Sequence, residues 1–288
     1  MSWLLLFLAA VVAGAINSVA GGGSFVSFPA LYAAHVAPIV ANATNTVALW
    51  PAGLASAYAY RKDMRHPART LVALGAASFV GGALGALLLL RTSNDAFMRL
   101  LPWLILVAAA LFTFGGKVTA KLRVRPPLDI SSAPGEGALS SALGRQVRGS
   151  ASARSTLGGR ETAGALLVAT ALQLVISVYG GYFGGGMGIL MLATLSMMGM
   201  SNIHAMNGLK TLLGAIINGV GVVTFILAGA VDWNTGGVMI AGATLGGYGG
   251  AVIARRMDPK WIRGFVIVVA WSMTAVFFFQ SYGRPLIE

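Results

Sequence analysis

The 288-residue sequence contains no cysteine, few histidines and little charge. Without cysteine there is no disulfide, thiolate metal site or cysteine nucleophile, and three scattered histidines, His35, His66 and His204, argue against a zinc site. Charged residues make up 10% of the chain and hydrophobic residues 57%, whereas a typical soluble domain is about 25% charged. So little charge does not cover the surface of a soluble globule. We therefore expect an integral membrane protein with no metal and no cofactor.

The few charged residues are mostly basic and unevenly distributed. The chain carries 20 Lys and Arg against 8 Asp and Glu, and 16 of the 20 fall in three stretches, 61–69, 117–160 and 255–263. These stretches separate long apolar runs, as cytoplasmic loops do in polytopic membrane proteins. A nucleic-acid-binding protein would instead gather its basic residues on one face or helix. We expect no nucleic-acid partner.

The apolar residues form ten segments of roughly the length that a bilayer requires, about 20 residues per span. The segments cover residues 3–20, 24–40, 43–60, 70–90, 97–116, 162–183, 186–201, 205–230, 236–254 and 262–281. The three basic stretches follow the third, fifth and ninth segments. One threading therefore places all three in the cytoplasm and both termini outside. The predicted fold is an all-α, multi-pass membrane protein.

Residues 117–161 differ from the rest of the chain. They are rich in Ser, Gly, Ala and Arg, include Pro126, Pro127 and Pro134, and show no sustained apolar period. We predict a flexible, basic cytoplasmic linker between a first transmembrane repeat, residues 1–116, and a second, residues 162–288. Regulation or lipid-headgroup binding by its arginines is the alternative to a plain tether.

Two motifs recur in the two halves. Gly21-Gly22-Gly23-Ser24 aligns with Gly184-Gly185-Gly186-Met187 at an offset of 163, and Ala43-Thr44-Asn45 aligns with Ala205-Met206-Asn207 at an offset of 162. Each half has five apolar segments, an odd number, so the second half starts on the opposite side of the membrane. We therefore predict inverted repeats, an arrangement typical of secondary transporters.

The glycine triplets interrupt otherwise apolar runs at equivalent places in the two halves. Three adjacent glycines do not continue a helix stably, and irregular backbone at membrane depth is tolerated where it is buried in protein or lines a wet cavity. We predict broken or re-entrant helices whose tips form a substrate site. The alternative is that the glycines only allow close helix packing.

Lys210 is the one charged residue that falls well inside an apolar segment, and the segments hold no Asp or Glu. It shares a helical stripe of polar and small residues with Asn207, Gly214 and Asn218. The equivalent position of the first half is Ala48. A lysine at the centre of a span costs about 2.5–3.5 kcal/mol on insertion scales, so it is retained for a function or it snorkels to the interface. Both interpretations remain open.

A cavity lined by the breaks and these side chains would offer hydrogen-bond donors and one full positive charge, with no opposing carboxylate. Such a site fits a small oxyanion rather than a cation or a proton relay. His204 is also compatible with an ordinary capping or interfacial role. The residues that we expect to bind substrate are Asn17, Ser18, Gly21, Gly22, Gly23, Ser24, Asn42, Asn45, Thr46, Gly184, Gly185, Gly186, Met187, His204, Asn207 and Lys210.

The sequence shows no hydrolytic or redox constellation and no Walker-type G-x-x-x-x-G-K-[ST] motif for ATP. We therefore expect a protein that is not an enzyme and a transport process driven by the substrate or an ion gradient. The sequence leaves the oligomeric state open, a homodimer included.

The paired motifs resemble those of the sulfite exporter TauE/SafE family. In the first half the resemblance rests on residues 13–25 (AGAINSVAGGGSF), on Pro29 and on residues 41–46 (ANATNT). In the second half it rests on residues 180–188 (GGYFGGGMG) and 205–210 (AMNGLK). The resemblance covers both halves outside the linker, which is longer here than in many members.

This resemblance implies a transporter of the bacterial inner membrane that exports a sulfur-containing oxyanion, such as sulfite, sulfoacetate or another organosulfonate. Alternating access is the expected mechanism for inverted repeats. An anion channel and a membrane scaffold without flux are the alternatives.

Overall fold

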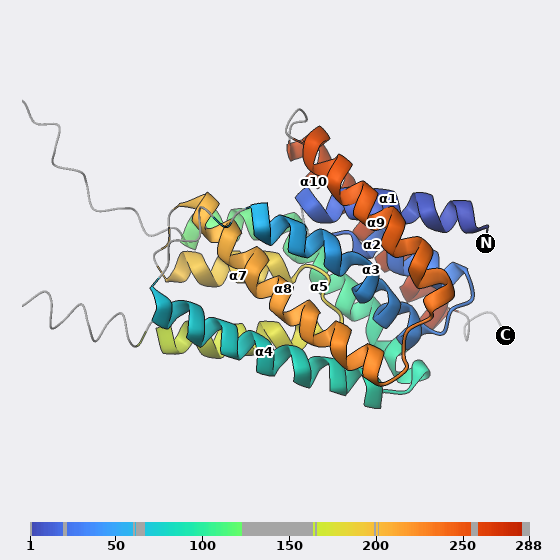
Figure 1. Cartoon of the computed structure of the whole chain (residues 1–288), viewed down its shortest axis with the longest axis horizontal. Helices are drawn as coiled ribbons and strands as arrows, with labels where there is room; N and C mark the ends of the chain where they lie inside the picture. Colours follow the sequence, from blue (N-terminus) through green and yellow to red (C-terminus); the bar gives the residue numbers. More distant parts are fainter. Residues whose placement is uncertain are drawn as a thin grey trace, which may run out of the picture.

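The computed structural model consists of helices throughout the residues that it describes, which are 2–19, 22–59, 61, 67–122, 164, 166–198, 200, 202–254 and 259–283. The helices are α1 (Trp3–Val19), α2 (Ser24–Ala33), α3 (Pro38–Ala59), α4 (Ala68–Arg91), α5 (Asn94–Leu122), an unlabelled helix (Leu166–Tyr182), α7 (Met187–Met197), α8 (Ile203–Leu227), α9 (Trp233–Ala254) and α10 (Pro259–Phe278), which continues into a π-helical segment (Phe279–Gly283). Several of them run along the long axis of the molecule (Figure 1). The predicted all-α architecture is confirmed.

The second predicted segment, residues 24–40, is longer than the helix it contains. α2 ends at Ala33, and His35 takes a left-handed conformation with φ of 63°, which no helix continues. Pro38 then begins α3, where its missing N–H leaves no hydrogen bond unmade. At another boundary, α5 continues to Leu122, past the predicted start of the linker. Residues 123–163, and with them most of that linker, lie outside the described residues.

The helices differ widely in length. Within the described part of the chain, four helical stretches are long and apolar enough to cross a membrane: Ala68–Arg91, Asn94–Leu111, Ala205–Leu227 and Gly264–Tyr282. α2 has 10 residues and α7 has 11. At 1.5 Å per residue each is about 15 Å long, half of a hydrocarbon core of about 30 Å. Each short helix follows a glycine triplet, as the sequence predicts for broken helices.

One end of the molecule is defined by hydrogen bonds between the ends of helices. The N–H of Ile39 donates a 3.1 Å hydrogen bond to Asn94 Oδ1, and the N–H of Asp232 donates one of 3.0 Å to Thr44 Oγ1. This end, which we call the Asn94 end, therefore gathers the starts of α3, α5 and α9 and the end of α8. The opposite end, where α5 finishes and the helix Leu166–Tyr182 begins, is called the linker end.

Two helix pairs pack through glycines with their backbones in contact. α1 packs on α9, where Gly242 faces Phe7 and Gly246 faces Val11. Because the contacts advance together along both chains, these helices run parallel. The helix Leu166–Tyr182 packs on α4 in the same way, with Gly85 against the main chain of Tyr182. Small residues commonly allow such close approach between membrane helices.

The two central helices, α3 and α8, run antiparallel. Trp50 Nε1 on α3 donates a 3.1 Å hydrogen bond to the carbonyl of Ala215 on α8, and the Trp50 ring packs against Gly219. Thr46, one turn before Trp50, lies near Gly221, which comes after Gly219. The crossing at Trp50 and Ala215 marks the middle of both helices.

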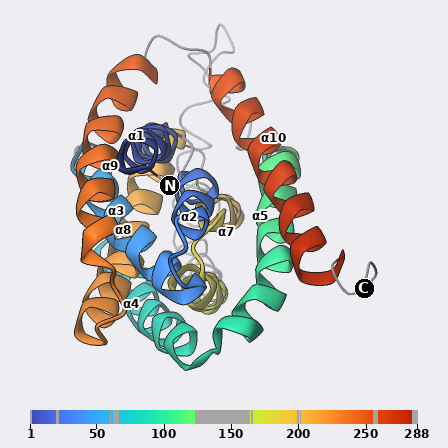
Figure 2. The same cartoon turned by 90° about the vertical axis from the view of Figure 1, so that its right-hand side faces the viewer.

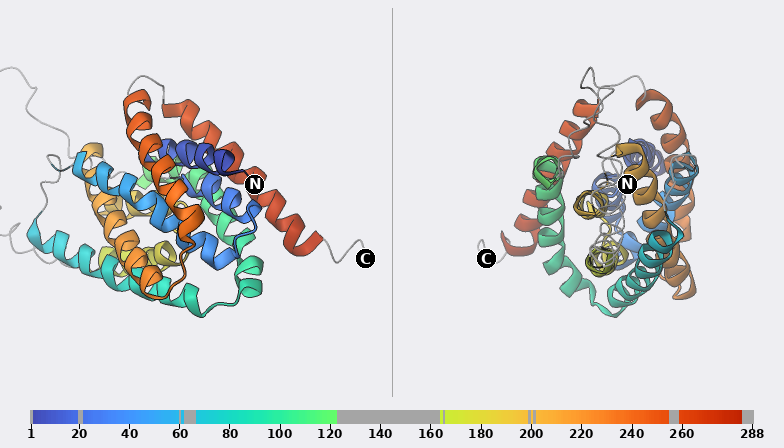
Figure 3. Two further views of the ribbon diagram at one scale, coloured as in Figure 1. Left: turned by 45° about the vertical axis from the view of Figure 1, so that its right-hand side comes forward. Right: turned by 90° about the vertical axis from the view of Figure 1, so that its left-hand side faces the viewer.

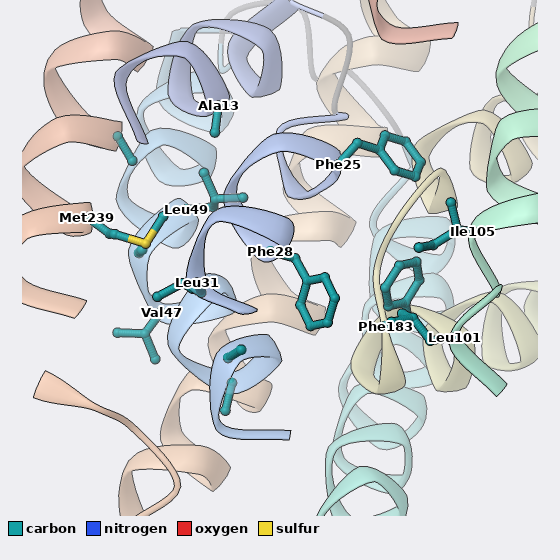
Figure 4. Packing of buried hydrophobic residues seen from close by; sticks show 14 of the residues in the cluster. Ala13, Phe25, Phe28, Leu31, Val47, Leu49, Leu101, Ile105, Phe183 and Met239 are labelled. Carbon is teal, nitrogen blue, oxygen red and sulfur yellow. The ribbon is translucent and has the colours of Figure 1, made fainter. Parts of the chain in front are cut away.

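The short helices lie inside the molecule. In Figure 2, α2 and α7 occupy the interior, with α3, α8 and α9 on one side and α5 and α10 on the other, and the view from the opposite end in Figure 3 agrees. α2 contacts α3 and α10, and α7 contacts α8 and α5. Phe25 and Phe28 point from α2 toward Phe183 and Ile105, whereas Leu31 points toward α3 (Figure 4). The glycine breaks are thereby held at the centre of the fold.

Candidate functional site

The first glycine break is packed tightly onto α1. Gly23 is buried with helical φ and ψ, and a Cβ at this position would lie 2.3 Å from the carbonyl oxygen of Ala13 and 2.9 Å from Asn17 Cβ. Gly22 is buried too, while Asn17 and Ser24 are half-buried beside it. The predicted site residues of this break are therefore neighbours. A glycine is required at position 23 because two backbones meet there.

The second glycine break has a different backbone conformation. Gly184 and Gly186 are left-handed, with φ of 81° and 77°, and the hydroxyl of Tyr179 donates a 2.5 Å hydrogen bond to the carbonyl of Gly185. The N–H groups of Gly185, Gly186 and Gly188 donate to no residue that the structure describes. Successive free N–H groups in this kind of backbone form anion-binding concavities, and these lie at the positive end of α7.

Lys210 lies beside this second break. Its aliphatic stem packs against Gly188, where an added Cβ would come within 3.3 Å of Lys210 Cδ. Lys210 and Asn207 are both half-buried, and the contact with Gly188 directs the Lys210 stem toward α7 and the interior. Met187, also half-buried, packs its sulfur against Gly180. The structure thus joins the lysine, the start of α7 and the free N–H groups in one region.

No described carboxylate opposes the charge of Lys210. Of the eight acidic residues, the described ones are Asp95 and Asp232, and both lie at the Asn94 end. Asp232 accepts hydrogen bonds from the N–H of Asn234 and from Thr235 Oγ1, which hold it at the start of α9. Over the same residues, no group of three or more acidic or histidine side chains is placed to hold a metal ion.

The asparagines of α3 form a separate, fully buried group. Asn42 and Asn45 are each 1% exposed. The Ser27 hydroxyl on α2 contacts the amide oxygen of Asn45 and the carbonyl of Gly23, at 3.0 Å for the latter. Asn42 Nδ2 donates a 2.9 Å hydrogen bond to the carbonyl of Tyr182 in the other half, and Asn42 Oδ1 has no partner among the described residues.

The predicted site residues therefore occupy two regions rather than one cage. Asn45 lies five residues before Trp50, on the side of the crossing that faces the Asn94 end. Lys210 lies five residues before Ala215, on the side that faces the linker end. At 1.5 Å per residue this separates their Cα atoms by about 15 Å along the helix axes. Thr46, which hydrogen-bonds the carbonyl of Asn42, belongs to the first region. The sequence expectation also named Gly21 and the side chains of Ser18 and His204, which lie outside what the structure describes.

Sequence reasoning missed three residues that position the site. Ser27 follows Ser24 by three residues on α2, a polar spacing that would have identified it. Gly188 stands in the second-half motif, two residues after the triplet, yet its role as the seat of the lysine stem requires the structure. Tyr179 is one aromatic among many, and no sequence signal marks its hydrogen bond to Gly185.

Comparison with known proteins gives concordant results. The model of the family described as sulfite exporter TauE/SafE matches residues 6–277. The chain is 28% identical to the probable membrane transporter protein YfcA of Escherichia coli strain K12, over 99% of this chain and 92% of that protein. It is 26% identical to a probable membrane transporter protein of Haemophilus influenzae, over 94% and 92% of the two chains.

A third relative, the probable membrane transporter protein ORF9 of Sinorhizobium sp, is 28% identical over 93% of this chain and 89% of its own length. No solved structure matches the chain. The family match covers nearly the whole sequence, and the relatives align along most of their length. The protein thus belongs to the sulfite exporter TauE/SafE family of membrane transporters.

Proposed function

We propose that the protein is a secondary transporter that exports a small sulfur-containing oxyanion, sulfite or an organosulfonate such as sulfoacetate, by alternating access. The observation that carries this proposal is the group of free N–H donors at Gly185, Gly186 and Gly188 beside Lys210. Fixed N–H dipoles and one ammonium that no described carboxylate opposes suit an anion with several acceptor oxygens. The family membership directs the choice toward sulfur oxyanions.

Alternating access follows from inverted repeats, for which the helix directions and contacts are the support. α1 runs toward the linker end and the helix Leu166–Tyr182 runs away from it, as an inversion requires. The contacts also correspond when each helix is replaced by its equivalent in the other half. The contact of α1 with α9 corresponds to that of the helix Leu166–Tyr182 with α4. The contacts of α2 with α3 and α10 correspond to those of α7 with α8 and α5. Residues 1–116 and 162–288 would then be the repeats, joined by the linker 117–161.

The proposed orientation places the Asn94 end and both termini outside a bacterial inner membrane and the linker end in the cytoplasm. The three basic stretches support it, since cytoplasmic loops carry excess Lys and Arg. Lys210 then lies in the cytoplasmic half of its span, where it meets an anion that leaves the cell. The partners implied are the small anion and the lipid bilayer.

Reconstituted vesicles test the proposal directly. Proteoliposomes loaded with sulfite are expected to show saturable, protein-dependent efflux, whereas vesicles with the Lys210→Met variant, which keeps the length of the side chain, are expected to lose it. Conductance of many ions per second would make the protein a channel, and the absence of flux for sulfite and sulfoacetate would overturn the assignment. Thermal stabilisation by sulfite, sulfate, thiosulfate, sulfoacetate and acetate then ranks the ligands.

A further inference from the structure

We propose that the aromatic cluster around Phe28 is the gate that closes the transport pathway toward the Asn94 end, and that a cavity beyond it is the vestibule on that side. The inference rests on the proposed transport function. It starts from a difference between positions that the repeat makes equivalent. On α3, Asn45 and Ala48 are 1% and 0% exposed, whereas Asn207 and Lys210, 162 residues later on α8, are half-buried.

One residue of each stripe contacts the short helix of its own half. Asn45 contacts Ser27 on α2, and Lys210 packs against Gly188 on α7. The partial exposure of Asn207 and Lys210 agrees with a pathway that reaches these two residues from the linker end. The matching surface of α3 has no such access. In the proposed gating scheme the interior is therefore closed next to Asn45 and accessible next to Lys210.

Phe28 is the centre of the closed side. Its ring, 1% exposed, lies 6.2 Å from the ring of Phe97 on α5, 6.5 Å from Phe183 beside the second break and 5.9 Å from Phe277 on α10. It also stacks on Tyr32 at 6.5 Å. Figure 4 shows Phe28 directed at Phe183. The cluster joins α2 of the first half to the second break, so as the proposed gate it would close the pathway beside the N–H groups of that break.

The side-chain amide of Asn42 carries an unpaired acceptor that disfavours the closed state. Asn42 Nδ2 holds the carbonyl of Tyr182, immediately before Phe183, but Oδ1 of the same amide is buried without a described partner. A buried acceptor without a donor is unfavourable, and water or a ligand donor satisfies it when the region opens. The ring contacts therefore stabilise the closed state, and the unpaired Asn42 Oδ1 destabilises it.

A vestibule lies on the far side of the rings. Two cavities of about 370 Å³ and 610 Å³ share Tyr32 and Gln280, and Phe277 lines the larger one. The ring centroids of Tyr32 and Phe277 are 5.8 Å apart, and both rings contact Phe28. These two residues therefore separate the vestibule from the gate. Arg99, Asp95 and Ser281 line the smaller cavity, where Arg99 would offer a cation to a passing anion. The Ser281 hydroxyl already donates a 3.0 Å hydrogen bond to the carbonyl of Met98.

Thiol labelling tests the gate, because the natural chain has no cysteine. Single cysteines are placed at Asn45 beneath the gate, at its equivalent Asn207, and at Ser281 in the vestibule, and each is reacted with a membrane-impermeant maleimide in nanodiscs. The cysteines of Asn207→Cys and Ser281→Cys are expected to react at least tenfold faster than that of Asn45→Cys. Equal rates at all three positions would overturn the proposal.

The gate variant is then combined with the buried reporter. Phe28→Ala is expected to accelerate labelling of Asn45→Cys at least tenfold, whereas Phe225→Ala, which removes an equally buried ring from α8, leaves it unchanged. Phe28→Leu, which keeps an apolar side chain, serves if Phe28→Ala does not fold, and is expected to accelerate labelling severalfold. If Phe28→Ala accelerates the labelling of Asn45→Cys no more than Phe225→Ala does, the proposed gate is wrong. Sulfite efflux is measured separately, so its failure removes the proposed function without deciding the labelling result.

Discussion

Asn42 on α3 donates a 2.9 Å hydrogen bond through Nδ2 to the main-chain carbonyl of Tyr182, the last residue of the helix Leu166–Tyr182. The bond joins a central helix of one half to the glycine break of the other. It also fixes the orientation of the amide, because exchanging Nδ2 and Oδ1 would set two oxygens against each other. The remaining Oδ1 is left without a described partner.

The loss of stability caused by a substitution of Asn42 should therefore depend on which hydrogen-bond acceptors the substitution leaves unpaired. Asn42→Leu orphans the Tyr182 carbonyl and is expected to lower stability by about 1–3 kcal/mol, the cost of one unsatisfied buried group. Asn42→Asp sets carboxylate oxygens against that carbonyl and is expected to cost more. Unfolding midpoints in detergent measure both, with Thr46→Val as the control, since Thr46 bonds only within α3. An aspartate variant as stable as the leucine variant would contradict the hydrogen bond.

The two parallel helix pairs that pack through glycines predict a second set of effects on stability. A Cβ at Gly85 would lie 2.1 Å from the carbonyl oxygen of Val178, and one at Gly246 would lie 1.9 Å from that of Val11. Gly85→Ala and Gly246→Ala should each force two helices apart and cost at least about 1–3 kcal/mol. Gly237→Ala on α9 meets no atom within 4 Å and is expected to gain up to about 1 kcal/mol from helix propensity.

The measurement is again the unfolding midpoint, compared across the three alanine variants. If Gly85→Ala and Gly246→Ala unfold at the temperature of Gly237→Ala, the helix pairs are not in backbone contact. A loss in only one of the two variants would contradict the equivalence of the pairs, and with it the exchange of halves on which the proposed inverted repeat depends.

Much of this fold is predictable from local sequence. Apolar run length and the glycine triplets give the helices and the two breaks, because each depends on residues close together in the chain. The end of α2 is missed because the left-handed position that ends the helix is His35 and not a glycine, and the turn is closed by the N–H of Val36, which donates a 3.3 Å hydrogen bond to the carbonyl of Leu31. The triplets are also alike in sequence, yet only Gly184 and Gly186 are left-handed among the described glycines of the two breaks.

The candidate site is less predictable than the fold. A stripe on α8 identifies Asn207 and Lys210, and a motif identifies Asn45, but their depths follow from how α3 and α8 cross. Composition and spacing carry no information on that crossing, which depends on the contact between Trp50 and Gly219. The separation of the polar residues into two regions is therefore visible only in three dimensions.

The second glycine break should tolerate no side chain at its centre. At Gly185 an added Cβ would lie 2.7 Å from the Phe183 ring, and a branched side chain would displace both that ring and the neighbouring N–H donors. Gly185→Val is expected to abolish sulfite efflux, and Gly22→Val to do the same at the first break. Gly53→Val on α3, which meets no atom within 4 Å, should retain it. Efflux at the wild-type rate in either break variant would show that the backbone there does not approach the ligand.

The charge of Lys210 is the sharpest test of what the site binds. Lys210→Met keeps the stem that packs on Gly188 and removes the ammonium, so folding and expression should be preserved. Loss of a hydrogen bond to a charged group, about 1.5–3 kcal/mol, predicts sulfite affinity about 10-fold to 150-fold weaker. Lys210→Arg keeps the charge but carries a larger head group, and it should retain part of the affinity. Thermal stabilisation by sulfite, measured as a titration for each variant, separates affinity from turnover. Wild-type affinity in Lys210→Met would mean that the ammonium snorkels to the interface and that the N–H groups of the second break bind the anion without it.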